Sequence, residues 1–255
     1  MSDGPVLSER RERVLVITLN RPDARNAVNL ALAEGIAAAL DALDADDEVA
    51  VGVITGAGTG FSAGVDLKAF VAGERPWVGD RGFAGIVQRS ARKPLIAAVE
   101  GFAVAGGLEI ALACDLIVAG SGAKLGIPEV KRSLVAAAGA LRRLPQRIPY
   151  SIAMELALTG DTIAAERAYE LGLVNRVTER GQALEAALEL AGAIAKNGPL
   201  ALAATKATLQ QQWDWGEEEF WQRQGELAAP VMASEDAREG ATAFAERREP
   251  VWRGR

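Results

Sequence analysis

Short apolar segments recur along the first half of the chain, separated by helix-like or glycine-rich segments. The expected strands are residues 14–19, 49–55, 95–99, 116–119 and 124–127. Between the first two, residues 29–43 place Leu32, Ile36, Leu40 and Leu43 at the spacing of a helix with one buried face. Strands that alternate with helical segments are typical of α/β folds with much parallel pairing. The sequence therefore predicts an α/β protein.

The second half of the chain is mainly helical in pattern. The expected helices are residues 151–158, 164–171, 183–196, 200–212 and a tail over 217–247, and only 174–178 is expected to be extended. Within the tail, Phe220, Trp221, Leu227 and Phe244 occupy the apolar helix positions. We therefore expect a mixed core over residues 1–195 and a helical C-terminal region over residues 196–255.

The residue types that are missing limit the possible chemistry. The 255 residues include no histidine and one cysteine, Cys114. This composition excludes Ser-His-Asp and Cys-His catalysis, histidine-ligated metals and an internal disulfide. The net charge of −6, without clustered lysine and arginine, argues against nucleic-acid binding. We expect no metal site and no separate cofactor, so carboxylates, lysine, tyrosine and backbone dipoles are the available catalytic groups.

The sequence also gives no sign of a membrane segment. The first 14 residues contain no apolar signal region, and no apolar stretch approaches the 18 residues of a membrane span. We therefore expect a cytoplasmic protein with no membrane partner.

Two glycine-containing turns follow expected strands, at residues 64–66 and 105–107. Backbone N–H groups in such turns favour negative charge, and two of them directed at one carbonyl would form an oxyanion hole. On spacing alone, glycines that permit tight turns are the simpler interpretation. Residues 58–63 also fit the loose dinucleotide pattern G-x-G-x-x-G/A, but no long helix follows them, which argues against nicotinamide binding.

Two glutamates stand out because of their neighbours. Glu109 lies within a run of small and apolar residues, and Glu129 follows Pro128 at the end of a short extended segment. Taken singly, each is explained as an acid at the start of a helix. Taken together, they could carry acid–base chemistry in a chain without histidine, if their environments separate their pKa values. The spacing alone does not show that they meet.

Several motifs together resemble the crotonase (enoyl-CoA hydratase/isomerase) superfamily over nearly the whole chain. They are LNRP at 19–22, NA at 26–27, FSAGVD at 61–66, KPLIAAVEG at 93–101, AGGLEIALACD at 105–115, GIPE at 126–129, LTGD at 158–161, LGLVN at 171–175 and GATAFAERR at 240–248. The resemblance implies a spiral of ββα units with a helical C-terminal trimerisation region. It also implies an acyl-CoA thioester substrate and a homotrimer or pair of trimers.

The resemblance assigns roles to particular residues. The N–H groups of Val65 and Gly106 would form the oxyanion hole, Glu109 would activate water for attack at C3, and Glu129 would supply the proton at C2. Because both acids are present, a 2-enoyl-CoA hydratase is favoured over an enoyl-CoA isomerase, another crotonase-type enzyme or a non-catalytic acyl-CoA-binding protein. The further substrate-binding candidates are Arg25, Ala63, Gly64, Asp66, Leu67, Lys68 and Gly107, and Arg247 is an additional candidate for a CoA phosphate.

The sequence departs from the family pattern in three places. Ala105 replaces the first glycine of a common triple glycine, and Glu100 stands where asparagine is usual. Residues 130–139 lack the proline and paired glycines of typical short-chain hydratases. That segment, like the irregular loop expected near residues 73–82, borders the acyl pocket in relatives. The sequence therefore leaves the size of the acyl group open, and a long-chain or ring-bearing group is one of the alternatives.

Overall fold

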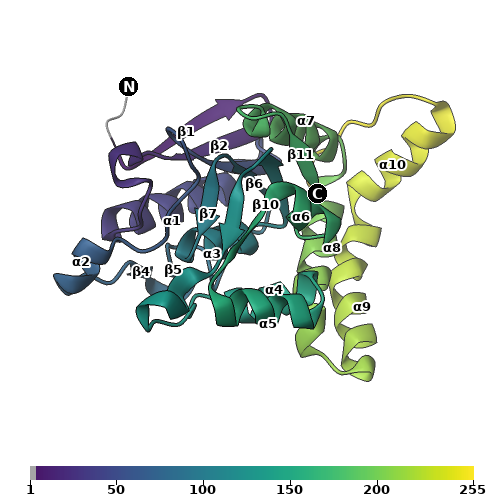
Figure 1. Ribbon diagram of the computed structural model, residues 1–255. Coiled ribbons are helices and arrows are strands. Elements are labelled where there is room, and N and C mark those ends of the chain that lie inside the picture. Colours follow the sequence, from purple (N-terminus) through teal and green to yellow (C-terminus); the bar gives the residue numbers. More distant parts are fainter. Residues whose placement is uncertain (1–3) are drawn as a thin grey trace.

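A six-stranded sheet forms the centre of the computed structural model, which describes residues 4–255 (Figure 1). Its strand order is β1 (Val6–Arg11), β2 (Val14–Leu19), β3 (Val51–Gly56), β6 (Leu95–Val99), β8 (Leu116–Gly120) and β11 (Arg176–Thr178). Strand β1 pairs antiparallel with β2, and every other pair is parallel. The α/β prediction with mainly parallel pairing is confirmed.

A smaller sheet lies beside the first and gives the fold its repeated ββα form. Its order is β10 (Thr162–Ala164), β9 (Lys124–Gly126) and β7 (Phe102–Val104), with β7 and β9 parallel. The chain passes from β6 in the large sheet to β7 in the small one and then into α3 (Gly106–Ala113). The turn at the start of α3 is therefore held between two sheets.

Helices cover both faces of the large sheet. On one face, the buried β-strand residues Val53, Ile96 and Val118 pack against α7 (Ala183–Ala195). This helix presents alanines at four-residue spacing, Ala187 and Ala191 among them, so that its backbone can approach the sheet closely. The other face packs against α1 (Leu30–Ala45) and α3, and this larger cluster surrounds the candidate site.

Shorter elements and the remaining helices complete the fold. The helices are α2 (Leu67–Val71), α4 (Ala140–Arg147), α5 (Tyr150–Thr159), α6 (Ala165–Glu170), α8 (Pro199–Gln211), α9 (Glu217–Ala233) and α10 (Glu235–Glu246). The short elements are η1 (Pro22–Ala24), β4 (Trp77–Val78), η2 (Gly79–Arg81), β5 (Gly82–Phe83), η3 (Pro128–Arg132) and η4 (Gln212–Asp214). No helix within residues 4–255 is both long and apolar enough to cross a bilayer.

The C-terminal helices α9 and α10 extend away from the sheets, at the right of Figure 1. The prediction of a continuous helical tail over 217–247 is wrong at one point, because α9 ends at Ala233 and a new helix, α10, begins after Ser234. Its hydroxyl accepts a hydrogen bond from the Ala237 N–H at 2.9 Å and caps α10. Two residues assigned to apolar helix positions, Trp221 and Phe244, are exposed in the chain. The division into a core and a C-terminal region at residue 195 stays a prediction.

Other elements differ from the sequence prediction in detail. The strands expected at 14–19 and 95–99 have those bounds, whereas β1, β7 and β10 were not predicted. The last two have only three residues each, too few for an alternating pattern to be recognised. Helix α4 was also missed, because it contains Pro145 and follows an alanine-rich segment. The irregular loop expected near 73–82 includes the short β4, η2 and β5 segments.

Candidate active site

The two glycine-containing turns lie against each other. The parallel bridge between Ser62 and Ala103, together with the hydrogen bond from the Val104 N–H to the Ser62 carbonyl at 3.1 Å, joins the two segments. Gly64 has a φ of +88°, and a Cβ on it would lie 2.7 Å from the backbone nitrogen of Gly106. Only glycine permits this approach, so the turns are closer than ordinary chain reversals require.

The backbone N–H groups of Val65 and Gly106 are free to bind a ligand. Within the described part of the chain, neither donates a hydrogen bond to a protein acceptor. Gly106 is the first residue of α3, so its N–H also lies at the positive end of the helix dipole. Two free donors on adjacent turns are the arrangement that an oxyanion hole needs.

Ala105, the departure from the family's triple glycine, takes a glycine-like conformation. Its φ of 52° and ψ of −133° lie in a region that side-chain-bearing residues rarely adopt, at a cost of about 1–3 kcal/mol. Its N–H donates to the Gly126 carbonyl at 2.9 Å, which ties the turn to β9. Ala105 therefore holds a strained backbone conformation at the start of α3, and its hydrogen bond to β9 helps to fix it.

Glu109 is buried in the first turn of α3, with 3% of its surface exposed. Its Oε1 accepts hydrogen bonds from the Ala138 N–H at 2.7 Å and the Ala140 N–H at 3.1 Å. Burial raises the pKa of Glu109 to about 7, although these two hydrogen bonds act in the opposite direction. A carboxyl group with a pKa near neutrality can exchange protons at physiological pH.

Glu129 lies in η3, directly after β9, and is partly buried. Its Oε2 is buried and has no hydrogen-bond partner among residues 4–255. Burial raises the pKa of Glu129, and the charge of Glu129 in turn contributes to the raised pKa of Glu109. The structure thus brings together the two acids that lie 20 positions apart in the sequence.

The other candidate binding residues differ in how they are placed. Arg25 lies over the ring of Phe102, 4.4 Å from its centroid, and its carbonyl accepts from the Ala63 N–H at 3.0 Å. Asp66 caps α2 and pairs with Arg21 at 3.0 Å, so its carboxylate already has protein partners. Its side chain therefore fixes the loop that carries the Val65 N–H.

Gly107, Leu67 and Lys68 have different surroundings. A Cβ on Gly107 would collide with the Ser62 carbonyl, so this glycine is needed for the close packing of the turns. Leu67 and Lys68 begin α2 and are exposed. Arg247, at the end of α10, lies at the opposite end of the molecule from α2, so one chain does not bring it near Lys68 (Figure 1).

The residues that hold Glu109 were not identified from the sequence. Ala138 and Gly139 lie at the end of the segment in which the chain departs from the family pattern, and Ala140 and Arg143 directly follow it. All of them lie 29 or more positions after Glu109. The glycine at position 139 was the one local sign in the sequence of a turn there. In the structure its φ is +103°. Glu100 also gains an explanation, because its Oε1 accepts from the N–H groups of Gly181 and Ala183 and caps α7.

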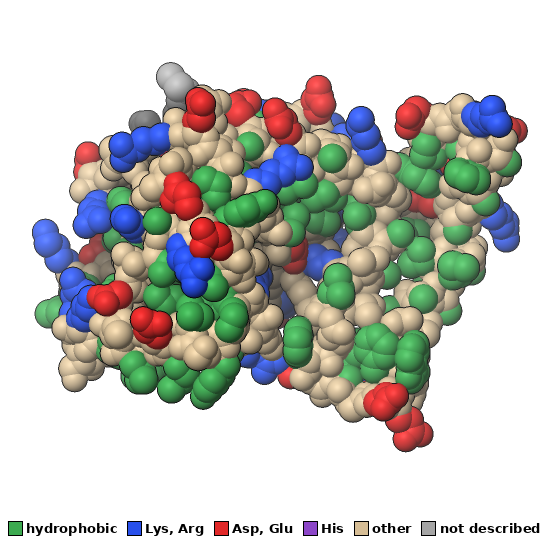
Figure 2. Space-filling model, turned by 45° about the vertical axis from the view of Figure 1, so that its right-hand side comes forward, with side chains coloured by type: hydrophobic (Ala, Val, Ile, Leu, Met, Phe, Trp, Pro, Cys, Tyr) green, Lys and Arg blue, Asp and Glu red, His purple; other side chains and the backbone are tan. Residues whose placement is uncertain are grey.

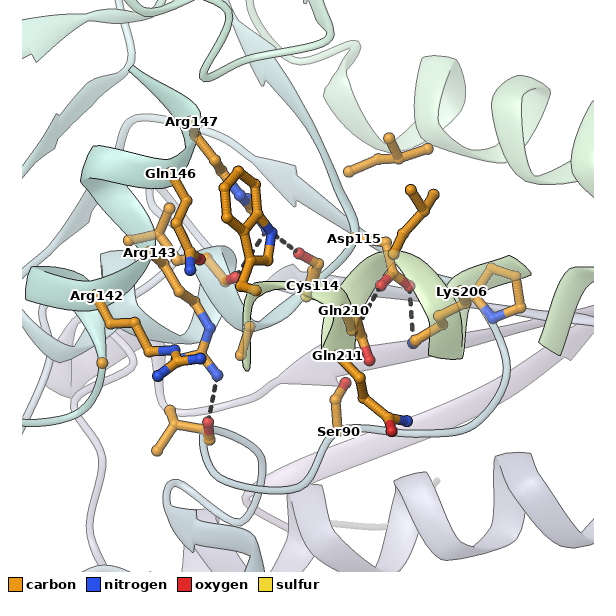
Figure 3. A pocket seen from close by; sticks show the side chains of 18 of the residues that line it. Ser90, Cys114, Asp115, Arg142, Arg143, Gln146, Arg147, Lys206, Gln210 and Gln211 are labelled. Atoms are coloured by element: carbon orange, nitrogen blue, oxygen red, sulfur yellow. Dashed lines mark hydrogen bonds and ion pairs between the residues drawn. The ribbon is translucent and has the colours of Figure 1, made fainter. Parts of the chain in front are cut away.

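A cavity of about 950 Å³ lies behind the Ala138–Ala140 turn, between α4 and α8 (Figure 3). Ala138 and Gly139 form part of its wall, but neither glutamate lines it. It is therefore adjacent to the acid pair and separate from the oxyanion hole. No group of three or more acidic or cysteine side chains within residues 4–255 is arranged to hold a metal ion.

Comparison of the sequence with known proteins shows which family the chain belongs to. A sequence profile described as enoyl-CoA hydratase/isomerase matches residues 9–255. The chain belongs to the enoyl-CoA hydratase/isomerase family. An enoyl-CoA hydratase of Mycobacterium tuberculosis is 43% identical, with 100% of this chain and 99% of that protein covered. A carnitinyl-CoA dehydratase of Salmonella typhimurium is 42% identical, with 96% and 97% covered.

A solved structure supports the same assignment. The crystal structure of an enoyl-CoA hydratase from Mycobacterium tuberculosis has a TM-score of 0.97 and 55% identity, with 99% of this chain and 100% of that chain covered. The expected crotonase-type α/β fold is confirmed, and so is the expectation of an enzyme of the enoyl-CoA hydratase class, a hydro-lyase. The hydratase/isomerase family contains relatives named for different acyl groups, so the substrate is a separate question.

Proposed function

We propose that this enzyme adds water across the 2,3 double bond of a 2-enoyl-CoA thioester to give a 3-hydroxyacyl-CoA. The observation that carries the proposal is the pair of interacting, partly desolvated acids, Glu109 and Glu129, next to two free N–H donors. An isomerase needs only one acid for its proton transfers, whereas hydration uses a base for water and an acid for carbon.

The oxyanion hole would carry the electrostatic part of the reaction. The thioester carbonyl would accept hydrogen bonds from Val65 and Gly106, and the negative charge that develops on its oxygen would be stabilised by these donors. Such preorganised donors act without rearrangement during the reaction, and each is worth about 3 to 4 kcal/mol in comparable sites.

The two glutamates would carry the proton transfers. Ionised Glu109 takes a proton from water as the water oxygen bonds to C3 and the π electrons move toward C2 and the carbonyl. Neutral Glu129 then gives its proton to C2 as the enolate collapses, and the proton held by Glu109 restores Glu129 before the next turnover. The raised pKa of Glu129 favours the neutral form that this role requires.

The test is the loss of conjugated-thioester absorbance when enzyme is added to 2-enoyl-CoAs of increasing chain length. Wild-type protein, Glu129→Gln and Glu155→Gln are compared, because Glu155 is an exposed glutamate on α5 without an ion pair within residues 4–255. We expect turnover to be lost in Glu129→Gln and retained in Glu155→Gln. Unchanged hydration by Glu129→Gln would refute the two-acid mechanism.

Other outcomes point to the alternatives. A 3-enoyl-CoA whose double bond shifts without gain of water would indicate an isomerase. Calorimetric binding of acyl-CoAs without turnover at any chain length would indicate an acyl-CoA-binding protein. The carnitinyl-CoA dehydratase among the relatives makes polar acyl groups worth including in the panel.

We also propose that the enzyme is a homotrimer or a pair of trimers. Hydrophobic side chains lie exposed along the C-terminal helices, at the right of Figure 2. They include Leu209, Trp213, Trp221, Met232 and Phe244. Exposed apolar groups of this size favour a protein contact. Light scattering on the purified protein tests this, and a monomer would refute it.

The binding roles of Arg25, Ala63, Gly64, Asp66, Leu67, Lys68 and Gly107, and the cytoplasmic location, stay predictions.

A further inference from the structure

The cavity behind the acid pair contains a row of basic side chains. Figure 3 shows Arg142, Arg143, Gln146 and Arg147 extending from α4 on one side, with Asp115, Lys206 and Gln210 on the other. Most of these groups have partners that account for them. Arg142 pairs with Asp214 at 2.5 Å, and Lys206 pairs with Asp115 at 2.8 Å.

Arg143 differs from its neighbours in what it touches. Its Nη2 donates to the Val87 carbonyl at 2.5 Å, and its Nη1 lies so close to Gly139 that a Cβ there would collide with it. Gly139 stands between Ala138 and Ala140, the residues whose N–H groups hold Glu109. The guanidinium therefore lies on the outer side of the turn that holds the carboxylate.

The charge of Arg143 is also unusual in its setting. No carboxylate lies within ion-pairing distance of it among the residues that the structure describes. The charge of Glu129, from η3, raises the pKa of Glu109, and the charge of Arg143, from α4, lowers it. Helix α4 also carries Arg142, which pairs with Asp214, and Arg147, which donates to the Leu112 and Cys114 carbonyls at the far end of α3. Strands β6, β7 and β8, which also pack against α3, contain no ionisable residue. Among the arginines of α4, Arg143 is thus the one whose charge partly opposes the effects of burial and of Glu129 on the pKa of Glu109.

We propose that Arg143 is a positioning residue for Glu109: it holds the Ala138–Ala140 turn against Val87 and keeps the carboxylate in place as the ionised base. The inference rests on the hydration chemistry proposed above, in which Glu109 activates water. Arg143 itself touches neither substrate nor reacting atoms, and it acts through the turn and through its charge. The ionised form of Glu109 is favoured by this charge, which opposes the rise in pKa that burial causes.

The test compares the pH dependence of kcat for hydration in wild type, Arg143→Gln, Arg143→Lys and Arg142→Gln. Arg142 is the matched control, because it lines the same cavity from the adjacent position but pairs with Asp214. We expect the acidic limb of the wild-type profile near the pKa of Glu109, about 7. Arg143→Gln should move that limb upward by about half a pH unit, which lowers kcat about threefold at pH values on the limb, with KM nearly unchanged.

The charge-retaining variant separates the two parts of the role. Arg143→Lys should keep the limb at its wild-type pH, because the positive charge remains, but have a lower kcat, because one ammonium cannot reach both Val87 and the turn. Arg142→Gln should match wild type in limb and kcat. If Arg143→Gln fails to fold, a wild-type kcat in Arg143→Lys refutes the proposal that Arg143 holds the Ala138–Ala140 turn against Val87.

A purely structural role predicts a different result. Arg143→Gln would then lower the thermal midpoint and leave the acidic limb where it is, which would overturn the proposal. An equal shift in Arg142→Gln would also overturn it, because any nearby charge would then suffice. Failure of the hydration chemistry is distinguishable, since Glu109→Gln would then remain active or the wild type would add no water at all.

Discussion

Replacing Glu109 by glutamine should change how the stability of the protein depends on pH. The folded state raises the pKa of this group from 4.5 to about 7. Between those values the folded protein keeps a proton that the unfolded chain releases, so the free energy of unfolding falls as the pH rises from 4.5 through 7. Below pH 4.5 this contribution is fully present, and above pH 7 it is lost.

The size of the effect follows from the shift. At about 1.4 kcal/mol per pKa unit, it corresponds to about 2 to 3 kcal/mol between pH 5 and pH 8.5. Glu109 is 3% exposed, so solvent screening does little to reduce this figure. Glutamine does not titrate, but its side-chain oxygen can still accept from Ala138 and Ala140. Any fixed cost of the amide cancels when the two pH values are compared.

The assay is urea unfolding of wild type and Glu109→Gln at pH 5 and pH 8.5, at one protein concentration because assembly affects apparent stability. We expect the variant to gain about 2 to 3 kcal/mol relative to wild type on going from pH 5 to pH 8.5, while hydration activity is lost. Glu155→Gln, on the exposed surface of α5, should show no such gain. If wild type and Glu109→Gln had the same pH dependence, Glu109 would not be the buried, proton-retaining acid described here.

Three further substitutions test other parts of the site. Ala105→Gly should raise the free energy of unfolding by about 1 kcal/mol, because it removes the strain of the positive φ and adds a smaller entropic cost; no gain on urea unfolding would count against strain there. Gly64→Ala should lower kcat about 100- to 1,000-fold by pushing the Val65 and Gly106 donors apart, and a wild-type kcat would exclude them as the oxyanion hole. Glu100→Ala should cost about 1 kcal/mol through loss of the cap on α7 and leave kcat unchanged, as thermal unfolding and the hydration assay would check.

The sequence revealed the parts of the fold that have a strong local pattern. The buried strand at 95–99 and the one-sided helix at 30–45 could be predicted because apolar spacing reports burial directly. Strand β7, with three residues, has no room for such a pattern. The break at Ser234 was missed although a serine followed by Glu235 and Asp236 is a recognisable helix start.

The candidate site could be predicted where motifs carry it and not where distant segments meet. Glu109, Glu129 and the two glycine-containing turns were identified because each lies in a recognisable stretch. The turn that holds Glu109 was not, because backbone N–H groups leave no mark on the sequence and Ala138 and Ala140 are chemically plain. Arg143 looks like a surface charge beside Arg142 until the structure shows that it lies against Gly139.

The most direct test of the two-acid hydration mechanism is to follow the oxygen atom of the added water. The enzyme is incubated with a 2-enoyl-CoA in heavy-oxygen water, and the product is analysed by mass spectrometry for wild type, Glu109→Gln and Glu129→Gln. We expect one heavy oxygen at C3 of the wild-type product and no labelled product from either variant. A wild-type product of unchanged mass with a shifted double bond, or full labelling by Glu129→Gln, would contradict a hydratase that works with these two acids.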